Sequence, residues 1–382
     1  MRDFIETFEG LDDPRTGNAK RHDLHEVLLI ALLTTLSGGE TCADMELFAE
    51  TKLPFLRTFM TLENGPPSHD TFSRLFRLLD PAQFRTCFIA FMQRFASTCE
   101  GVIAFDGKSL RRSFDKASSS SPLHMVSAFA ADARLVLGQI AVDDKSNEIT
   151  AMPKLIDMLM LKGRVVTADA LNCQREIAAK ICEKEADYAL ALKGNQGNLY
   201  NDVQAFLDDP DTPLDTVETT DGDHGRIEVR TASVSADIDW LQDAHKWPGL
   251  EAVGKIVSTR EIGGKTSTQT RYYLLSAAFP AARFNTIVRS HWAVENSLHW
   301  VLDVTMNEDQ LRNRLDHGPE NLAMLRHLAL NVTKLEPSKG SMRGKLKRAG
   351  WNNSYLLELL AQFKRKRASR PTWTWSQAGF LT

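Results

Sequence analysis

Two aspartates in this chain each follow a short apolar run typical of a buried strand. Asp106 comes directly after residues 102–105 (VIAF), and Asp169 comes directly after residues 165–168 (VVTA). A buried carboxylate is costly unless a cation compensates for its charge, and Mg²⁺ prefers oxygen ligands of this kind. A third acid, Glu295, on a helix facing the sheet would complete a site in which two ions act on a phosphodiester. The alternative interpretation is that each aspartate only caps a turn or a helix.

Glu295 lies at the centre of residues 291–300, which read HWAVENSLHW. His291 and His299 each stand four residues from Glu295, so an uninterrupted helix would carry all three on one face. A zinc site is one interpretation, but three ligands spaced in this way span about 12 Å of helix axis, too far for one tetrahedral ion. We therefore expect the histidines to contact a substrate phosphate or to orient Glu295. The two tryptophans of the segment are expected to pack in the core or against a neighbouring domain rather than to stack on bases.

The composition indicates a globular protein with more than one structural unit. Its 382 residues exceed the size of most single hydrophobic cores. Five cysteines without a C-x-x-C pair argue against a cysteine-based zinc site and favour a reducing compartment. The N-terminal sequence lacks the basic and then apolar pattern of a secretion signal, so we expect a cytoplasmic protein.

The charge of the chain is unevenly distributed. The formal net charge is −3, yet the region from Arg312 onward holds 14 lysines and arginines against 4 acids. Segregation of this kind predicts a basic region that contacts a phosphate backbone, and hence a nucleoid-associated protein. The alternative is an ordinary solvated charged surface.

Changes in sequence pattern divide the chain into regions. Two helices around the Gly65-Pro66-Pro67 turn could form a helix-turn-helix unit that binds DNA. Later, strands alternate with helices and acids follow the strands, which predicts a mixed α/β sheet with ligands at its carboxyl edge. A strand-rich stretch with a hairpin at Gly263-Gly264 then precedes one long helix that contains Glu295. The expected regions are a helical N-terminal domain (1–95), an α/β core (96–200 and 283–330), a β-rich insertion (201–282) and a basic C-terminal region (331–382).

Several blocks of sequence resemble, in order, those of DDE-type insertion-sequence transposases, specifically the group that contains the H-repeat-associated proteins. The resemblance extends from about residue 8 to about residue 360, and its most specific blocks are AFDGKSLRRS, VVTADALNCQREIA, DYALALKGNQGNL and HWAVENSLHWVLDVTMNEDQLRNR. It implies a ribonuclease-H-like fold, DNA strand cleavage and transfer, and dependence on Mg²⁺ or Mn²⁺. Carried over by motif, the metal-binding catalytic triad is Asp106, Asp169 and Glu295.

One departure from related transposases concerns the residues around Glu295. Some relatives carry a Tyr-x2-Arg-x3-Glu-x6-Lys signature, whereas this chain has Val288, His291 and Leu302 at the other three positions. The phosphate contacts of the missing arginine and lysine must therefore come from elsewhere. The candidates are Arg289, His291, His299 and Lys193.

Three further basic residues, Lys108, Arg111 and Arg112, closely follow Asp106 and could contact the DNA backbone, or else lie on a solvated loop. Together these expectations describe a DNA transposase that joins insertion-sequence ends and works as a homodimer on DNA. The alternatives are a catalytically inactive, transposon-derived DNA-binding regulator and a stand-alone nuclease of the same fold.

Overall fold

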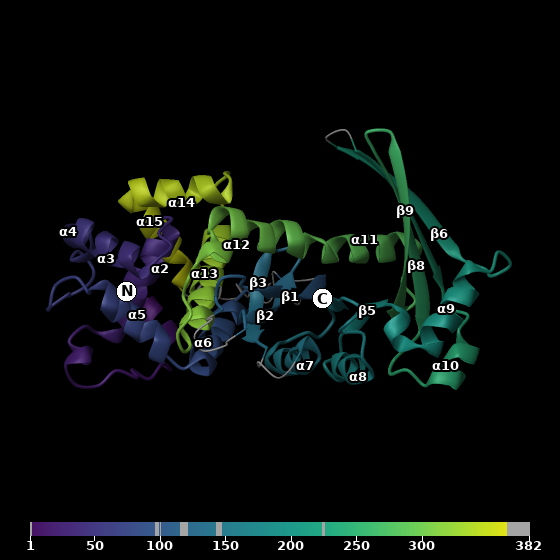
Figure 1. Ribbon diagram of the computed structural model, residues 1–382, viewed down its shortest axis with the longest axis horizontal. Helices are drawn as coiled ribbons and strands as arrows, with labels where there is room; N and C mark the ends of the chain where they lie inside the picture. The colour runs from purple at the N-terminus through teal and green to yellow at the C-terminus, as the bar shows by residue number, and fades with distance from the viewer. Residues whose placement is uncertain are drawn as a thin grey trace, which may run out of the picture.

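The computed structural model describes residues 2–95, 99, 101–114, 121–142, 147–223 and 226–364. One sheet of nine strands forms its centre, in the order β3-β2-β1-β4-β5-β9-β8-β7-β6. Helices cover the faces of this sheet and gather at one end of an elongated molecule (Figure 1). The strands are β1 Val102–Ser109, β2 His124–Ala130, β3 Leu135–Ala141, β4 Val165–Ala168, β5 Asp187–Leu192, β6 Asp215–Asp223, β7 Arg226–Ser235, β8 Ala252–Ile262 and β9 Lys265–Leu275.

Strands β1 to β5 form a ribonuclease-H-like sheet. Strands β1, β4 and β5 are parallel, while β2 runs antiparallel to β1 and β3 antiparallel to β2. Every residue of β4 is buried and β2 is buried along nearly its whole length, as expected for strands covered on both faces. The predicted fold class, a mixed α/β sheet with flanking helices, is confirmed.

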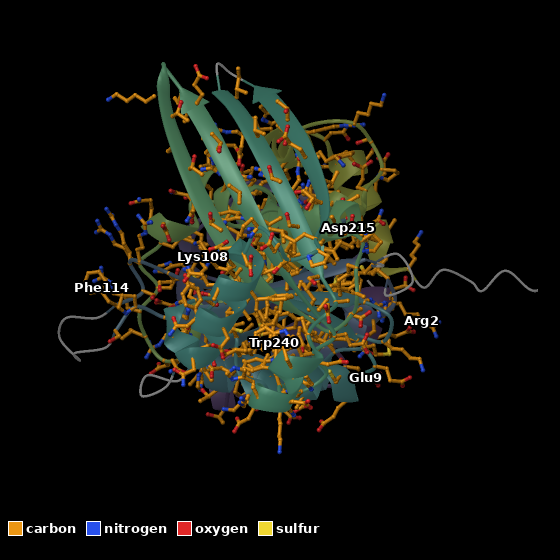
Figure 2. The ribbon with its side chains drawn as sticks, turned by 90° about the vertical axis from the view of Figure 1, so that its right-hand side faces the viewer. Arg2, Glu9, Lys108, Phe114, Asp215 and Trp240 are labelled. Carbon is orange, nitrogen blue, oxygen red and sulfur yellow. The ribbon has the colours of Figure 1, made fainter. Side chains whose placement is uncertain are left out.

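The strand-rich insertion continues the same sheet. Strand β9 pairs with β5 from Ala189↔Leu275 to Leu192↔Tyr272, and β8, β7 and β6 follow as antiparallel neighbours. The expected hairpin joins β8 to β9, where Gly263 and Gly264 both have positive φ angles that suit glycine. Figure 2 shows these four strands rising from the body of the molecule, with Asp215 near their base. Strand β6 was not predicted from the sequence.

Two sets of helices cover the faces of the sheet. Helix α11 (Ala281–His291) crosses one face, while α7 (Glu148–Met158) and α8 (Arg175–Glu183) lie on the other (Figure 1). Helix α11 lies close to β8, since a Cβ atom added at Gly254 would stand 2.8 Å from the ring of Phe284. Two further helices, α9 (Asn198–Asp208) and α10 (Asp239–His245), pack at the base of the insertion.

The N-terminal and C-terminal helices form one assembly at the end of the molecule. Helix α2 is apolar on nearly every side and is buried against α3, α13 and α14, as a helix without a polar face must be. From α13, Asn331 donates to the carbonyl of Val136 and accepts from its N–H at 2.8 and 2.9 Å, which satisfies part of the free edge of β3. The helices are α1 Arg2–Phe8, α2 Leu24–Leu36, α3 Cys42–Thr51, α4 Leu53–Leu56, α5 His69–Leu78, α6 Pro81–Gln93, α13 Gly318–Leu335, α14 Met342–Trp351 and α15 Asn353–Leu360.

The basic C-terminal region is partly folded into this assembly. In α14, Lys345 forms an ion pair of 2.9 Å with Glu336, and the guanidinium of Arg348 stacks over Tyr355. The second basic cluster, residues 364–367, lies outside the described residues except for Lys364. No helix in the described part of the chain combines the length and apolar character needed to cross a membrane.

Candidate active site

Two parallel strands place Asp106 and Asp169 side by side. The register of β1 and β4 pairs Ala104 with Thr167, and each aspartate stands two residues further along its chain. Residues two apart on a strand lie on the same face, so both carboxylates approach the face that α11 covers. Asp169 directly follows β4, as predicted. Asp106 lies inside β1 rather than at its end, because pairing with β2 continues as far as Ser109.

The segment that contains Glu295 is not the single regular helix that was predicted. Helix α11 ends at His291, a π-helical turn spans Glu295–His299, and α12 (Trp300–Thr305) follows. In the π-helical turn the N–H of Trp300 donates to the carbonyl of Glu295, one residue further than in an α-helix. The wider turn changes the rotation of the side chains around the axis.

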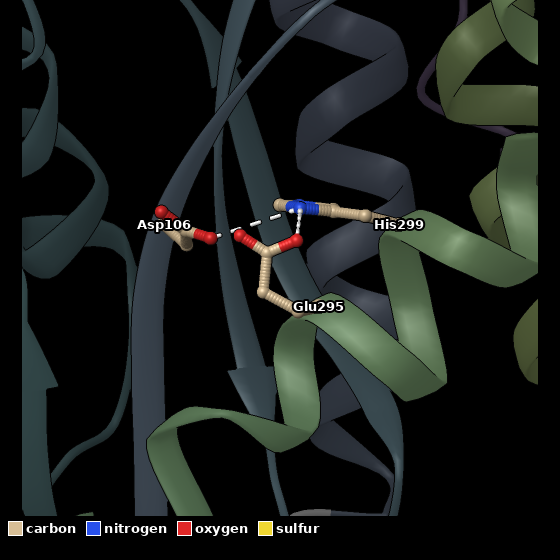
Figure 3. A group of neighbouring side chains, drawn as sticks. All are labelled: Asp106, Glu295 and His299. Carbon is tan, nitrogen blue, oxygen red and sulfur yellow. Dashed lines mark ion pairs between the residues drawn. The ribbon is translucent and has the colours of Figure 1, made fainter. Parts of the chain in front are cut away.

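As a result, the two histidines have different partners. The Nδ1 atom of His291 lies 3.0 Å from the hydroxyl of Thr167 on β4. The Nδ1 atom of His299 lies 3.7 Å from a carboxylate oxygen of Asp106 and 3.7 Å from one of Glu295 (Figure 3). His299 therefore lies beside Asp106 and Glu295.

The donor atoms of Asp106, Glu295 and His299 all lie within 4.8 Å of one another. The two carboxylates suit Mn²⁺ or Mg²⁺, which prefer oxygen ligands, whereas the imidazole is a ligand typical of softer transition-metal ions. Asp169 lies outside this group but lines the same pocket, which has a volume of about 280 Å³. The pocket is lined by Asp106, Thr167, Ala168, Asp169, Ala170, Ala189, Ala191, Lys193, Gln269, Arg271, Tyr273, Val288, His291, Trp292 and Glu295.

The electrostatics of the site favour a bound cation. Burial, together with the negative charges of Glu295, Glu148 and Asp169, raises the pKa of Asp106 to about 7. Several carboxylates held close together disfavour one another's ionised forms, and a cation would relieve that repulsion. Burial has the opposite effect on the histidines, lowering the pKa of His291 to about 4 and also lowering that of His299. His291 is therefore neutral near pH 7.

The sequence did not indicate a chain of hydrogen bonds behind Asp169. The side-chain amide of Asn172 donates to Asp169 at 3.0 Å and to Glu148 of α7 at 2.8 Å. On its other oxygen, Glu148 is bound by the Nε2 atom of His124 at 2.7 Å. A Cβ atom at Gly107 would stand 2.2 Å from that oxygen, so a larger residue beside Asp106 would require the side chain of Glu148 to shift. The only sequence signal for Asn172 was its position, three residues after Asp169.

The predicted DNA contact Lys108 lies in a cluster of charged groups. Its ammonium group forms ion pairs with Asp303, Glu308 and Asp309 at 2.7, 2.9 and 3.3 Å, and its side chain is 11% exposed. Asp303 belongs to α12, and Glu308 and Asp309 belong to the turn that follows it, so β1 lies beside both.

The other predicted DNA contacts lie at different distances from the pocket. Lys193 is exposed and lines it. Arg111 is 81% exposed with its guanidinium 3.1 Å from Asp309, and Arg289 is paired with Asp221 at 2.8 Å. Arg112 is exposed on the turn after β1. Contact of any of these residues with DNA stays a prediction.

The two tryptophans of the 291–300 segment are more exposed than expected. Trp300 is 57% exposed and Trp292 is 41% exposed, so neither lies in the core. Trp292 does contact the insertion, because the guanidinium of Arg271 on β9 lies 4.5 Å from its ring centroid. Arg271 also lines the pocket and was not identified from the sequence.

Comparison with known proteins identifies the family to which the chain belongs. Residues 97–332, which include all three acids, match the family model described as "Transposase DDE domain". The chain belongs to the DDE transposase family. Residues 5–92 of this transposase match the model described as "DDE_Tnp_1-associated". The family resemblance found in the sequence is therefore confirmed.

Two relatives from Escherichia coli (strain K12) are similar to the transposase over nearly its whole length. The putative protein YbfL is 39% identical over 373 residues, covering 94% of this chain and 98% of the relative. The H repeat-associated putative transposase YhhI is 38% identical with the same coverage. Among solved structures, a piggyBac transposase synaptic complex with hairpin DNA matches with a TM-score of 0.41 at 12% identity, over 97% of this chain and 78% of that one.

Proposed function

We propose that this transposase cleaves and joins phosphodiester bonds at the ends of its insertion sequence, with Asp106, Asp169 and Glu295 as catalytic acids. One observation carries the proposal. Three carboxylates from three distant parts of the chain line one pocket, together with the cations Lys193 and Arg271. Acids that hold metal ions beside cations that attract phosphate are what phosphoryl transfer requires.

Asp106 and Asp169 would hold Mg²⁺ or Mn²⁺ between them, and Glu295 would complete the site. A bound divalent cation supplies an activated oxygen nucleophile and stabilises charge on the leaving oxygen. The protein's own residues prepare this site. Asn172 holds Asp169 in one orientation, and the side chain of Glu295 is 55% exposed, which would leave it accessible to DNA.

The DNA backbone would be bound by basic residues in and around the pocket. Exposed Arg111, Arg112 and Lys193, with the basic C-terminal region, would supply attraction that does not depend on sequence. The N-terminal helices would recognise the insertion-sequence ends or supply dimer contacts. Because transposition joins two ends, we expect the active species to be a homodimer on DNA.

The proposal is tested by incubating the purified protein with Mg²⁺ and DNA that carries its element's terminal repeats. Glu295→Gln and Asp106→Asn should each lower strand cleavage by about a thousand-fold or more, because a mispositioned ion forfeits several kcal/mol of transition-state stabilisation. Glu176→Gln, at an exposed position on α8, is the matched control and should cleave normally.

The same assay separates the transposase from its alternatives. Binding of the repeats without metal-dependent cleavage would contradict the enzymatic proposal and indicate a DNA-binding regulator. Cleavage without joining of the ends to target DNA would indicate a nuclease.

A further inference from the structure

The residue at position 291 cannot supply the positive charge that relatives place there. His291 stands where the signature of related transposases has an arginine, but its Nδ1 atom is engaged by Thr167. Burial also keeps its ring neutral. A substrate phosphate in this pocket therefore needs another cation.

Strand β9 of the insertion provides one. Gln269, Arg271 and Tyr273 are spaced two apart, so they share one face of the strand, and all three line the pocket with the catalytic acids. The pairing of Ala191 with Tyr273 brings that face next to β5, where alanines leave the space open. The pairing of β9 with β5 thus places Arg271 at the active site, although this residue belongs to the insertion and not to the catalytic core.

The guanidinium of Arg271 is held in place without being neutralised. It donates to the side-chain oxygen of Gln269 at 3.0 Å and lies over the ring of Trp292. Within the part of the chain that the structure describes, no carboxylate forms an ion pair with it. Arg289 and Lys108, by contrast, are both bound to acids.

We propose that Arg271 is a phosphate-binding residue of this active site and contacts the non-bridging oxygens of the scissile phosphate. The proposal rests on the proposed function and assigns to the insertion the role that the signature arginine has in relatives. A planar guanidinium can bind two phosphate oxygens at once, and Trp292 restricts its orientation. The insertion then contributes directly to the chemistry.

The test measures binding rather than turnover. Fluorescence anisotropy compares two terminal-repeat duplexes, one natural and one with an uncharged methylphosphonate at the scissile position, in Ca²⁺ so that no cleavage occurs. Wild-type protein should bind the natural duplex about 10- to 100-fold more tightly, the range expected for a hydrogen-bonded charge pair. Arg271→Gln should bind the two duplexes almost equally, and Arg271→Lys should regain part of the difference.

Arg283→Gln, at an exposed position on α11 that does not line the pocket, is the control and should keep the full discrimination. If Arg271→Gln discriminates as strongly as wild type, Arg271 does not contact the scissile phosphate, although the proposed function stands. If wild-type protein does not prefer terminal-repeat DNA to random duplex, both proposals are wrong.

Discussion

Asn172 forms hydrogen bonds with two carboxylates. Its substitution should therefore lower catalysis more than the substitution of an ordinary loop residue. It holds Asp169 through both its backbone N–H and its side-chain amide, at 3.2 and 3.0 Å. Glu148 fixes the same amide from the other side. The orientation of Asp169 therefore depends on a residue of α7, on the opposite face of the sheet.

We expect Asn172→Ala to lower cleavage and the apparent affinity for Mn²⁺ by about 10- to 100-fold, the usual effect of removing a group that orients a metal ligand. Mn²⁺ titration of cleavage and isothermal titration calorimetry would measure the two effects. Gln174→Ala is the control, because its amide donates to the carbonyl of Leu171 in the same loop rather than to an acid of the site. Equal Mn²⁺ affinity in Asn172→Ala and wild type would contradict the positioning role.

At the scale of elements, the cluster around Lys108 ties β1 to the chain that follows α12. Glu308 is 3% exposed and is bound both by Lys108 and, at 2.9 Å, by Arg326 of α13. Strand β1 carries Asp106, and the helical segment before the cluster carries Glu295. The cluster therefore fixes the distance between two of the proposed catalytic acids.

Removing the charge of Glu308 should destabilise the fold strongly. Glu308→Gln would remove the acidic partner that the buried cations Lys108 and Arg326 share. Such a change lowers the free energy of unfolding by about 3–5 kcal/mol. Urea denaturation at pH 7 would measure it. Glu6→Gln, which breaks the exposed pair with Arg2, should change stability by less than about 1 kcal/mol. A loss at Glu308 no larger than this would contradict a structural role for the cluster.

The contribution of Glu308 should also depend on pH. Burial alone would raise its pKa, but Arg326 and Lys108 lower it to about 2, below its ordinary value of 4.5. A carboxyl group whose pKa is lower in the folded state stabilises the fold above pH 4.5, and this stabilisation disappears as the pH falls from 4.5 toward 2. The difference in urea stability between wild type and Glu308→Gln should be constant above about pH 5 and shrink below it. A difference that grows on acidification would contradict this assignment.

At the scale of the whole molecule, the insertion is continuous with the catalytic sheet. Strand β9 pairs with β5, and the core beneath α11 combines insertion residues such as Ile256 with helix residues such as Phe284. The tip of the β8–β9 hairpin, beyond Thr259 and Thr268, is largely exposed. The tip of this hairpin and the base of the insertion should therefore respond differently to deletion.

Replacing residues 260–267 with an Asn-Gly turn should leave the melting temperature within a few degrees of wild type, because it removes mainly exposed hairpin. Replacing residues 212–278 with a glycine-serine linker should produce aggregated protein, since it exposes the edge of β5 and the core under α11. Thermal unfolding and size-exclusion chromatography would measure both. A soluble, cooperatively folding protein from the large deletion would show that the insertion is independent of the core.

The sequence predicted the fold class because apolar strands and amphipathic helices alternate plainly along residues 102–192. It also named Asp106, Asp169 and Glu295, which the structure brings to one pocket. Arg271 was missed because its position depends on pairing between β5 and β9, which are far apart in the chain. The π-helical turn was missed because a change in backbone hydrogen bonding leaves the spacing of His291 and His299 unchanged in the sequence.

The two edge strands of the sheet, β3 and β6, are protected in different ways. At β3, Asn331 engages the backbone of Val136. At β6, Asp215 accepts the N–H of Ala281, and Glu218 and Asp221 add further acids to a strand that offers little apolar surface to a partner. Neither edge strand therefore favours pairing with a strand of another chain, and charged edges of this type protect proteins from aggregation. We therefore expect copies that meet on DNA to do so through helices and loops, and the free protein to resist sheet-to-sheet polymerisation.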